Sequence, residues 1–546
     1  MKGRYFSNHP RTIAFVTEAF LVAWTLLSPA SAQNVTATPN ASVAAAPSPP
    51  SARAGRVAAA AIAATRLPAI PPGPVQPTWE SLRANYKDPD WFRDGKFGIM
   101  MHWGIYSVPA HGSEWYVRYM YGGNKGIMQW HTQHFGPPEK FGYKDFFPMF
   151  TAAKWDPDAW AQLFKAAGAK YVIASGEHHD GFSNWKSDIN PFNSVNYGPH
   201  RDLVGDLLTA LRKVGLKTGV ANHSNAHFDF IPALPGSDEF DPKWAAFYSV
   251  ADRSDAAYGK FVETWATKNM ELIDKYQPDM LWFDFNGTDR SWDPVKMRLA
   301  AYYYNRAAEW GKSVAISSKG QSFLAGMLMD YERQGRAPKK LTDYVWQPDD
   351  PISDKFGYVE VPDANGNMVG LPLKSPGSLV GNLVTNVSRN GNLLLNISPK
   401  ADGTIPDSQQ QVLLAIGKWL GVNGDAIYGT RPWKMSEEGR VHFTTKDQTL
   451  YAISLDWPAN NPLTIPALGE GKGLEGKIEK VELLGHNGPL EFTQDAGGLK
   501  VTFPAEKPCD YAYSLRISGL KLPPAAPSTP VNPATLPTDA TGIIRQ

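Results

Sequence analysis

Several apolar runs in this sequence end on a residue that can bind a ligand or react with one. Asp284 follows the run 280–283, which comes directly after a helix-like stretch. In a parallel sheet the carboxyl ends of the strands meet on one side, and in α/β barrels that side carries the chemistry. We therefore expect a single site built from such strand ends. Its other expected members are His102, His178, His179, His223 and Lys319.

The chemistry that suits Asp284 is nucleophilic attack on a sugar. Trp282 stands two residues earlier, so both side chains point to the same side of a strand. A carboxylate fixed in this way can approach an electrophilic sugar carbon from one side, and glycoside hydrolysis needs a second carboxyl group. Spacing does not choose among the available carboxyl groups. These are Glu114, Glu177, Asp180, Asp289, Asp330 and Glu332.

The clustered histidines allow two interpretations. Imidazoles together with an aspartate are also what a zinc or iron hydrolase requires. However, neither H-x-H nor H-E-x-x-H occurs in the sequence, and adjacent residues such as His178 and His179 point in opposite directions in a strand. We expect neutral imidazoles that hydrogen-bond sugar hydroxyl groups, with Glu114 and Trp115 beside them. We expect no metal.

The bulk properties exclude several classes of partner. The 546 residues carry 54 basic and 53 acidic side chains, a net charge of +1, without a run of five like charges. This pattern offers no footprint for nucleic acid or an anionic membrane. No G-x-G-x-x-G stands between a predicted strand and helix, and no Walker-type loop occurs, so no nucleotide cofactor is expected. We therefore expect the binding partner to be uncharged.

The two ends of the chain differ in composition from the rest. Residues 1–32 combine a basic start, an apolar stretch and a small-residue cleavage site, which predicts a signal peptide and export to the periplasm or outside the cell. We therefore expect no membrane span in the mature chain. Residues 33–78, rich in Ala and Pro, predict a linker, and residues 521–546 a Pro-rich tail. Cys509 is the only cysteine, so no intramolecular disulfide is expected.

The elements that would position the strand ends alternate in type. Buried strand-like runs at 170–175, 216–222, 279–285, 313–319 and 392–398 alternate with helix-like stretches at 157–169, 202–215, 261–277, 293–312 and 407–424. This order predicts a parallel (β/α)8-like TIM barrel over 79–433. The alternation weakens after Lys319, so some members should be irregular. From 434 to 520 the period changes to that of short antiparallel strands, which predicts a C-terminal antiparallel β-sandwich.

Four blocks of the sequence carry a resemblance to a known family. The segments at 96–116, 177–187, 278–287 and 386–433 closely resemble successive blocks of the α-L-fucosidases of glycoside hydrolase family 29, and the likeness covers about residues 80–520. The resemblance implies a catalytic barrel followed by a sandwich, no metal, and exo-acting hydrolysis of terminal α-L-fucose from glycans with retention. It leaves two alternatives, a fucose-binding barrel without turnover and an exo-glycosidase for another sugar.

The resemblance also assigns roles to residues. Asp284 would be the nucleophile and Trp282 would line the sugar. The stretch 327–336 resembles a D-x-E-R-G-R block, which points to Glu332 as acid/base, although Gln334 interrupts the block and leaves Asp330 or Glu114 as alternatives. We expect Glu332 to be more desolvated than Asp284, or closer to negative charge. Residues that would contact fucose are His102, Glu114, Trp115, His178 and His179.

One further departure concerns the floor of the pocket. The family commonly has tyrosines after G-L-K-x-G, whereas Asn222 and His223 stand there in this chain. We expect this difference to affect the sugar pocket and the choice of leaving group.

Overall fold

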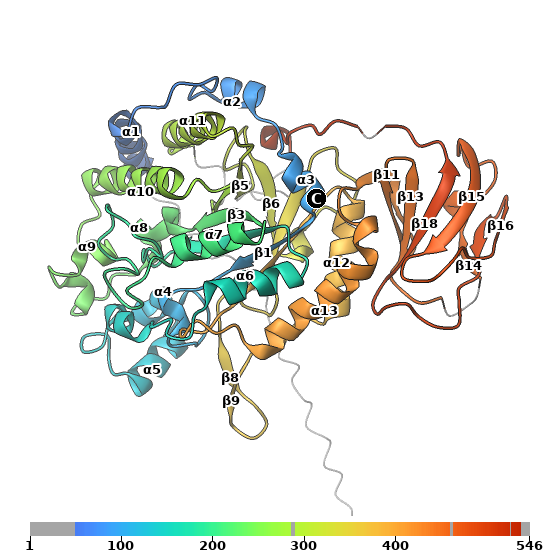
Figure 1. Cartoon of the computed structure of the whole chain (residues 1–546). Coiled ribbons are helices and arrows are strands. Elements are labelled where there is room, and N and C mark those ends of the chain that lie inside the picture. Colours follow the sequence, from blue (N-terminus) through green and yellow to red (C-terminus); the bar gives the residue numbers. More distant parts are fainter. Residues whose placement is uncertain (1–49, 286–289, 459–461, 525, 537–546) are drawn as a thin grey trace, which may run out of the picture. The chain divides into compact units, whose positions relative to one another are not determined.

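Eight parallel strands of the computed structural model close into a barrel (Figure 1), in the order β1-β10-β7-β6-β5-β4-β3-β2. The structure describes residues 50–285, 290–458, 462–524 and 526–536. The closed ring of parallel strands confirms the predicted TIM-like barrel. Its strands are β1 (Phe97–Met101), β2 (Tyr171–Glu177), β3 (Lys217–Asn222), β4 (Met280–Phe283), β5 (Ala315–Lys319), β6 (Leu328–Glu332), β7 (Trp346–Pro351) and β10 (Leu393–Ile397).

The barrel strands are apolar on both faces because both faces are covered. Along β1, Met100 belongs to a cluster inside the barrel, whereas its neighbours Ile99 and Met101 pack outward with the helices. The inner cluster also takes one residue in two from other strands, including Ile173 on β2 and Trp282 on β4. This alternation places Trp282, and hence Asp284, on the inner side of the barrel.

Helices cover most of the connections between strands. An aspartate or serine N-cap starts four of them: Asp156 for α6, Asp202 for α7, Ser254 for α10 and Ser375 for α12. The covering helices are α6 (Pro157–Ala166), α7 (Leu203–Lys213), α10 (Asp255–Tyr276), α11 (Asp293–Glu309), α12 (Pro376–Ser388) and α13 (Asp407–Asn423). Before the barrel lie α2 (Trp79–Asn85) and α3 (Asp90–Gly95).

One side of the barrel lacks these helices. The chain passes from β5 to β6 through residues 320–327 without a helix, and from β6 to β7 with only the 3-10 turn η6 (Gln334–Arg336). After β7 a hairpin, β8 (Glu360–Pro362) and β9 (Met368–Gly370), precedes α12. The alternation of the sequence weakens after Lys319 because the helical half of two βα units is missing.

Short helices surround the mouth of the barrel. The β1–β2 connection contributes α4 (Tyr116–Arg118), α5 (Lys125–His134) and the irregular turns η1 (Ile105–Ser107), η2 (Tyr119–Gly123) and η3 (Tyr143–Met149). The β3–β4 connection contributes α8 (His227–Phe230), α9 (Ala245–Tyr248) and the turns η4 (Ser224–Ala226) and η5 (Asp238–Phe240). Aromatic contacts join the two connections, for example between Phe147 and Phe247.

Part of the expected linker is folded. Within 33–78, residues Pro50–Arg66 form helix α1, which lies against α10 and α11 (Figure 1). Ala60, Ala63, Ala64 and Leu67 are buried there. The expectation of a coreless linker is wrong for this segment, because alanine has high helix propensity and small side chains let two helices approach closely. Residues 1–49, which include the predicted signal peptide, lie outside the described residues.

The C-terminal domain contains two antiparallel sheets, as predicted. One has the order β11-β12-β13-β18-β15 and the other β14-β17-β16, and Phe443, Leu499 and Leu515 are fully buried in a common core. The bounds are β11 (Arg431–Glu438), β12 (Val441–Lys446), β13 (Thr449–Ser454), β14 (Leu463–Ile465), β15 (Gly476–Leu483), β16 (Phe492–Asp495), β17 (Gly498–Val501) and β18 (Tyr513–Leu520).

This domain is joined to the barrel helices. Arg389, at the end of α12, pairs with Glu437 on β11, and the indole of Trp419 on α13 donates to the carbonyl of Ala512 at 2.8 Å. Among the described helices, none has the length and apolar character needed to cross a membrane.

Candidate active site

The residues singled out from the sequence come together at the carboxyl ends of the barrel strands. Each of the first four strands is followed directly by one of these residues: β1 by His102, β2 by His178, β3 by His223 and β4 by Asp284. Lys319 and Glu332 are the last residues of β5 and β6. Six neighbouring strands thus supply one mouth with functional side chains.

Two side chains, those of Lys319 and His179, hold the carboxylate of Asp284. Its Oδ1 lies 2.8 Å from Nζ of Lys319, and its Oδ2 lies 3.3 Å from Nε2 of His179. Burial alone would raise the pKa of Asp284, but the Lys319 charge and the His179 hydrogen bond outweigh it and bring the pKa well below its usual value. The carboxylate is therefore ionised, as a nucleophile must be.

Lys319 connects the carboxylates of the site. Besides Asp284, its Nζ lies 3.5 Å from Asp349 and 3.7 Å from Glu332, and it lies over the ring of Trp282. Burial lowers the pKa of Lys319, but the surrounding carboxylates reverse this and raise it well above its ordinary value. Lys319 is thus a fixed positive charge.

Glu332 and Asp284 both lie close to Lys319, which limits the distance between the two carboxylates. The sum of the two distances from Nζ, about 6.5 Å, is the upper limit of the separation between the nearest oxygens of the two carboxylates. Retaining glycosidases place their carboxyl groups about 5–5.5 Å apart and inverting ones about 6.5–9.5 Å. The limit is compatible with retention.

The expected difference in burial between the two carboxylates is reversed. The side chain of Glu332 is 24% exposed and that of Asp284 12%, and Arg336 lies 3.0 Å from Glu332. Of the two expected causes, greater desolvation of Glu332 is wrong, because β6 ends at Glu332 and leads into a partly exposed turn rather than under a helix. The other expected cause, a closer negative charge, stays a prediction.

The other candidates for the second carboxyl group are already engaged or lie elsewhere. Glu177 forms a buried ion pair with Lys268, Asp180 accepts from the hydroxyl of Tyr143, and Glu114 accepts from the backbone N–H of Gly357. Asp289 lies outside the described residues.

Asp330 forms a buried acid pair with Asp349 beneath the lysine. The indole N–H of Trp282 donates to Asp330 at 2.9 Å, and Asp330 and Asp349 interact directly. Burial raises the pKa of both groups, and the negative charges of Asp330 and Glu332 raise that of Asp349 further, well above its ordinary value. A protonated Asp349 relieves the repulsion between them. Asp330 thus orients Trp282.

Neutral imidazoles form the opposite side of the mouth. His102, His178 and His223 are each at most 4% exposed. Burial lowers the pKa of each ring, well below the usual value for His178 and His223. His179 is held differently, since its Nδ1 lies 2.7 Å from the carbonyl of His223 and its Nε2 contacts Asp284.

Aromatic side chains complete the walls. The ring of Trp115 contacts those of His179 and Phe230, and the ring of His223 contacts Trp282. Phe356 lies against His102 with ring centroids 4.9 Å apart. Such walls suit the apolar face of a sugar.

Sequence reasoning missed several residues of this site. They are Arg336, Asp349, Phe356 and Asn396. Asp349 and Phe356 lie in stretches whose polar or mixed composition gave no strand signal. Only Asn396, within the predicted strand 392–398, and Arg336, within the D-x-E-R-G-R-like block, stood in segments already singled out.

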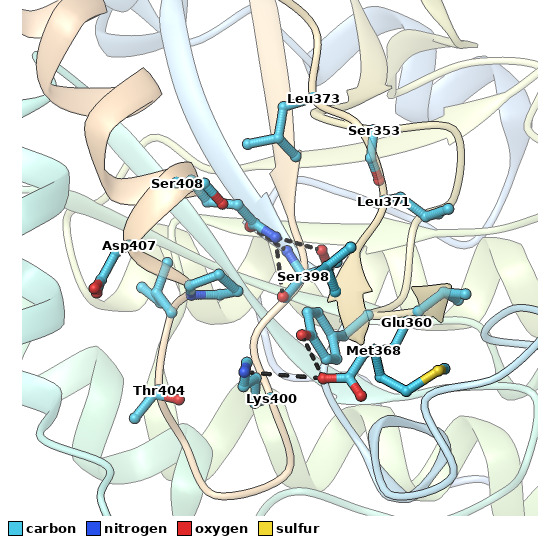
Figure 2. Close-up of a pocket in the computed structure, with 17 residues that line it drawn as sticks. Ser353, Glu360, Met368, Leu371, Leu373, Ser398, Lys400, Thr404, Asp407 and Ser408 are labelled. Atoms are coloured by element: carbon cyan, nitrogen blue, oxygen red, sulfur yellow. Dashed lines mark hydrogen bonds and ion pairs between the residues drawn. The ribbon is translucent and has the colours of Figure 1, made fainter. Parts of the chain in front are cut away.

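A separate cavity of about 550 Å³ lies beside the mouth (Figure 2). It is bounded by the β8–β9 hairpin and the start of α13, and its polar contacts join Tyr358 and Lys400 to Glu360. None of its lining residues is one of the strand-end residues around Asp284.

A closed parallel barrel whose mouth holds an ionised aspartate and a nearby glutamate defines a barrel glycoside hydrolase. The family model for alpha-L-fucosidase matches residues 63–425, and the model for the alpha-L-fucosidase C-terminal domain matches residues 435–518. The chain belongs to the α-L-fucosidase family.

Named relatives agree with this assignment. Human tissue alpha-L-fucosidase is 34% identical over 83% of this chain and 94% of its own length, and human plasma alpha-L-fucosidase is 33% identical over 81% and 92%. The solved structure of Thermotoga maritima alpha-fucosidase in complex with fucose is 34% identical, covers 81% of this chain and 100% of that one, and has a TM-score of 0.66.

Proposed function

We propose that the protein is an exo-acting, retaining α-L-fucosidase that removes terminal α-L-fucose from glycans by double displacement. The observation that carries the proposal is the ionised Asp284 at the end of β4, with Glu332 within about 6.5 Å across the same lysine. Family membership and the fucose complex of a relative support the choice of sugar.

In the first step, Asp284 attacks the anomeric carbon while Glu332 donates a proton to the leaving glycosidic oxygen. The bond to the leaving group breaks, and a covalent fucosyl-enzyme ester forms with inverted configuration. In the second step, Glu332 takes a proton from water, which attacks the same carbon and releases Asp284. The two inversions give retention.

The histidine side of the mouth would hold the sugar. Neutral imidazoles can accept or donate hydrogen bonds without adding charge, so His102, His178 and His223 suit the hydroxyl groups of fucose. Trp115 and Trp282 would face its apolar surface, including the C6 methyl group. Glu114, fixed by the N–H of Gly357, has a second oxygen for a hydroxyl group.

We further propose that the substrate is a fucosylated glycan or glycoconjugate met outside the cytoplasm. The signal-like composition of residues 1–32 supports export.

Hydrolysis of an aryl α-L-fucoside by the chain lacking residues 1–32 tests the proposal. Asp284→Ala and Glu332→Ala should each lose most turnover, and azide should restore it. Azide on Asp284→Ala should give the β-fucosyl azide, since one displacement inverts the centre, and on Glu332→Ala it should give the α-azide. Asp402→Ala, which removes a surface partner of Lys154, is the matched control and should keep full activity.

Two results would contradict the proposal. Fucose binding without turnover by the unchanged protein would make it a sugar-binding barrel. Faster hydrolysis of an aryl galactoside than of the fucoside would make it a glycosidase for another sugar.

A further inference from the structure

Three histidines at the mouth lie where three neighbouring strands end. His102, His178 and His223 each come directly after β1, β2 and β3, which pair side by side in the barrel. Adjacent strands lie about 4.8 Å apart, so side chains at equivalent strand ends converge. The ring centroids are 4.8–5.4 Å apart, and one ring nitrogen from each residue lies within 4.8 Å of the others.

The tautomer of His102 leaves a lone pair available. Nδ2 of Asn396 donates to the carbonyl of Phe356 at 2.8 Å, so Oδ1 is the atom that lies 2.7 Å from Nδ1 of His102. An amide oxygen only accepts, and Nδ1 of His102 therefore carries the proton. Its Nε2 is free as an acceptor. Metal-binding histidines commonly have this arrangement, with the second nitrogen donating to a fixed oxygen.

The other two rings contain buried nitrogens without partners. Within the described part of the chain, Nδ1 of His178 and Nε2 of His223 have no hydrogen-bond partner, although both side chains are more than nine-tenths buried. A buried polar atom without a partner costs roughly 1–3 kcal/mol. These nitrogens thus have unused capacity to bind a ligand.

We propose that His102, His178 and His223 form a binding site for a divalent transition-metal ion of the zinc class, which competes with the sugar. Three neutral imidazoles and one open position are a ligand set that Zn²⁺ accepts in tetrahedral geometry. With Zn–N distances of about 2.0–2.1 Å, the ligand nitrogens must approach one another more closely than the 4.8 Å within which they now lie. The carboxylate of Asp284 acts on His102 and His223, and that of Glu114 on His102, and both favour a cation there against the opposing charge of Lys319.

This ion is not a participant in hydrolysis. The proposed reaction uses Asp284 and Glu332, and the ion would occupy the place of the sugar hydroxyl groups that the same imidazoles bind. The competition with sugar rests on the proposed function, whereas metal binding itself does not.

Titration of the chelator-treated, full-length protein with Co²⁺, followed by visible absorption and equilibrium dialysis, tests the site without any assay of activity. We expect one ion per chain. His223→Asn and His178→Gln should each weaken binding by more than about 100-fold, since loss of an outer partner alone costs about 10–100-fold. Asn396→Ala should fall within that 10–100-fold range.

Two controls locate the ion. His179→Gln removes a neighbouring imidazole whose nitrogens are already engaged, and His134→Gln removes an exposed surface histidine. Both should bind Co²⁺ as the unchanged protein does. Circular dichroism of each variant checks folding.

Zn²⁺ should raise KM for the aryl fucoside and leave kcat unchanged. Absence of saturable Co²⁺ binding, or binding that survives both His223→Asn and His178→Gln, would overturn the metal site. Non-competitive inhibition by Zn²⁺ would contradict the overlap of the metal site with the sugar site. Failure of fucoside hydrolysis alone would count against the proposed function and leave the Co²⁺ titration valid.

Discussion

The two sides of the barrel mouth differ in both charge and construction. The side formed by β1, β2 and β3 presents neutral, buried imidazoles, and helices α6 and α7 join its strands. The side formed by β5, β6 and β7 presents a lysine among carboxylates, and no α-helix joins its strands. Asp284, on β4, lies between them and contacts His179 on one side and Lys319 on the other.

On the proposed mechanism, this difference separates sugar binding from bond cleavage. Uncharged donors and acceptors recognise hydroxyl groups without a large desolvation cost, whereas charges fix the protonation state of the nucleophile. Substitutions on the imidazole side should therefore act mainly on KM, and substitutions on the carboxylate side mainly on kcat. Four variants test this division.

The largest effect is expected from Lys319→Met. Loss of the positive charge leaves Asp284 buried without its main partner, and kcat should fall on the order of 100–1000-fold. The lysine lowers the pKa of Asp284, so its removal raises that pKa, and the acidic limb of the pH–rate profile should move to higher pH. A profile with an unmoved acidic limb would contradict this role. Lys165→Met, on the surface of α6, is the control.

On the imidazole side, His102→Phe should raise KM about tenfold and change kcat less. A neutral hydrogen bond contributes about 0.5–1.5 kcal/mol, and the phenyl ring keeps the packing against Phe356. Steady-state kinetics with the aryl fucoside separates the two constants. A fall in kcat with constant KM would contradict the division of sugar binding and bond cleavage between the two sides of the mouth.

Gln334→Ala tests the helix-free connection. The side chains of Gln334 and Asn386 exchange two hydrogen bonds, which fix the turn that carries Arg336 next to Glu332. Their loss should lower the free energy of unfolding by about 1–2 kcal/mol and kcat by less than about tenfold. Asn386→Ala should lower the free energy of unfolding further, because its amide also donates to the carbonyl of Asn392. If Gln334→Ala matches the unchanged protein in both measurements, the turn is held by other contacts.

The smallest change in activity is expected from Asp349→Asn, less than about fivefold, because an amide resembles a protonated acid in shape and bonding. The pKa of Asp349 is raised in the folded protein, so its stabilising contribution is complete below its unfolded pKa, about 3.9, and is lost as the pH rises through the folded value. Asparagine does not ionise. Denaturant unfolding should therefore show the variant gaining stability relative to the unchanged protein as the pH increases from about 4.

Sequence reasoning reached the regular half of the barrel and not the irregular half. An apolar run that ends on His102, His223 or Asp284 identifies a buried strand and its functional end at once, because both faces of the strand are covered. The strand Trp346–Pro351 contains two prolines, a glutamine and two aspartates. Its residues are buried through contacts with Lys319 and Tyr171 from distant strands, and no local pattern reports such contacts.

Helix α1 illustrates a second limit. Its composition, about half alanine with few large apolar side chains, resembles that of a linker, and only the packing against α10 distinguishes the two. The burial of the acid pair of Asp330 and Asp349 could not be predicted from their residue types, because it depends on the closure of the barrel. The family resemblance supplied Glu332, whereas its exposure followed from the turn that ends β6.

The register of the first three strands also limits where the chain can accept insertions and deletions. Met100 pairs with Ile173, and a register shift after Ser175 on β2 brings Glu177 opposite Asn222, so that His178 and His223 follow their strands side by side. A single-residue insertion inside any of these strands would turn its histidine from the rim to the wall, because side chains alternate along a strand. Insertions beyond the rim leave the histidines in place. Engineering of the leaving-group preference should therefore change the length of the loops and leave the strands intact.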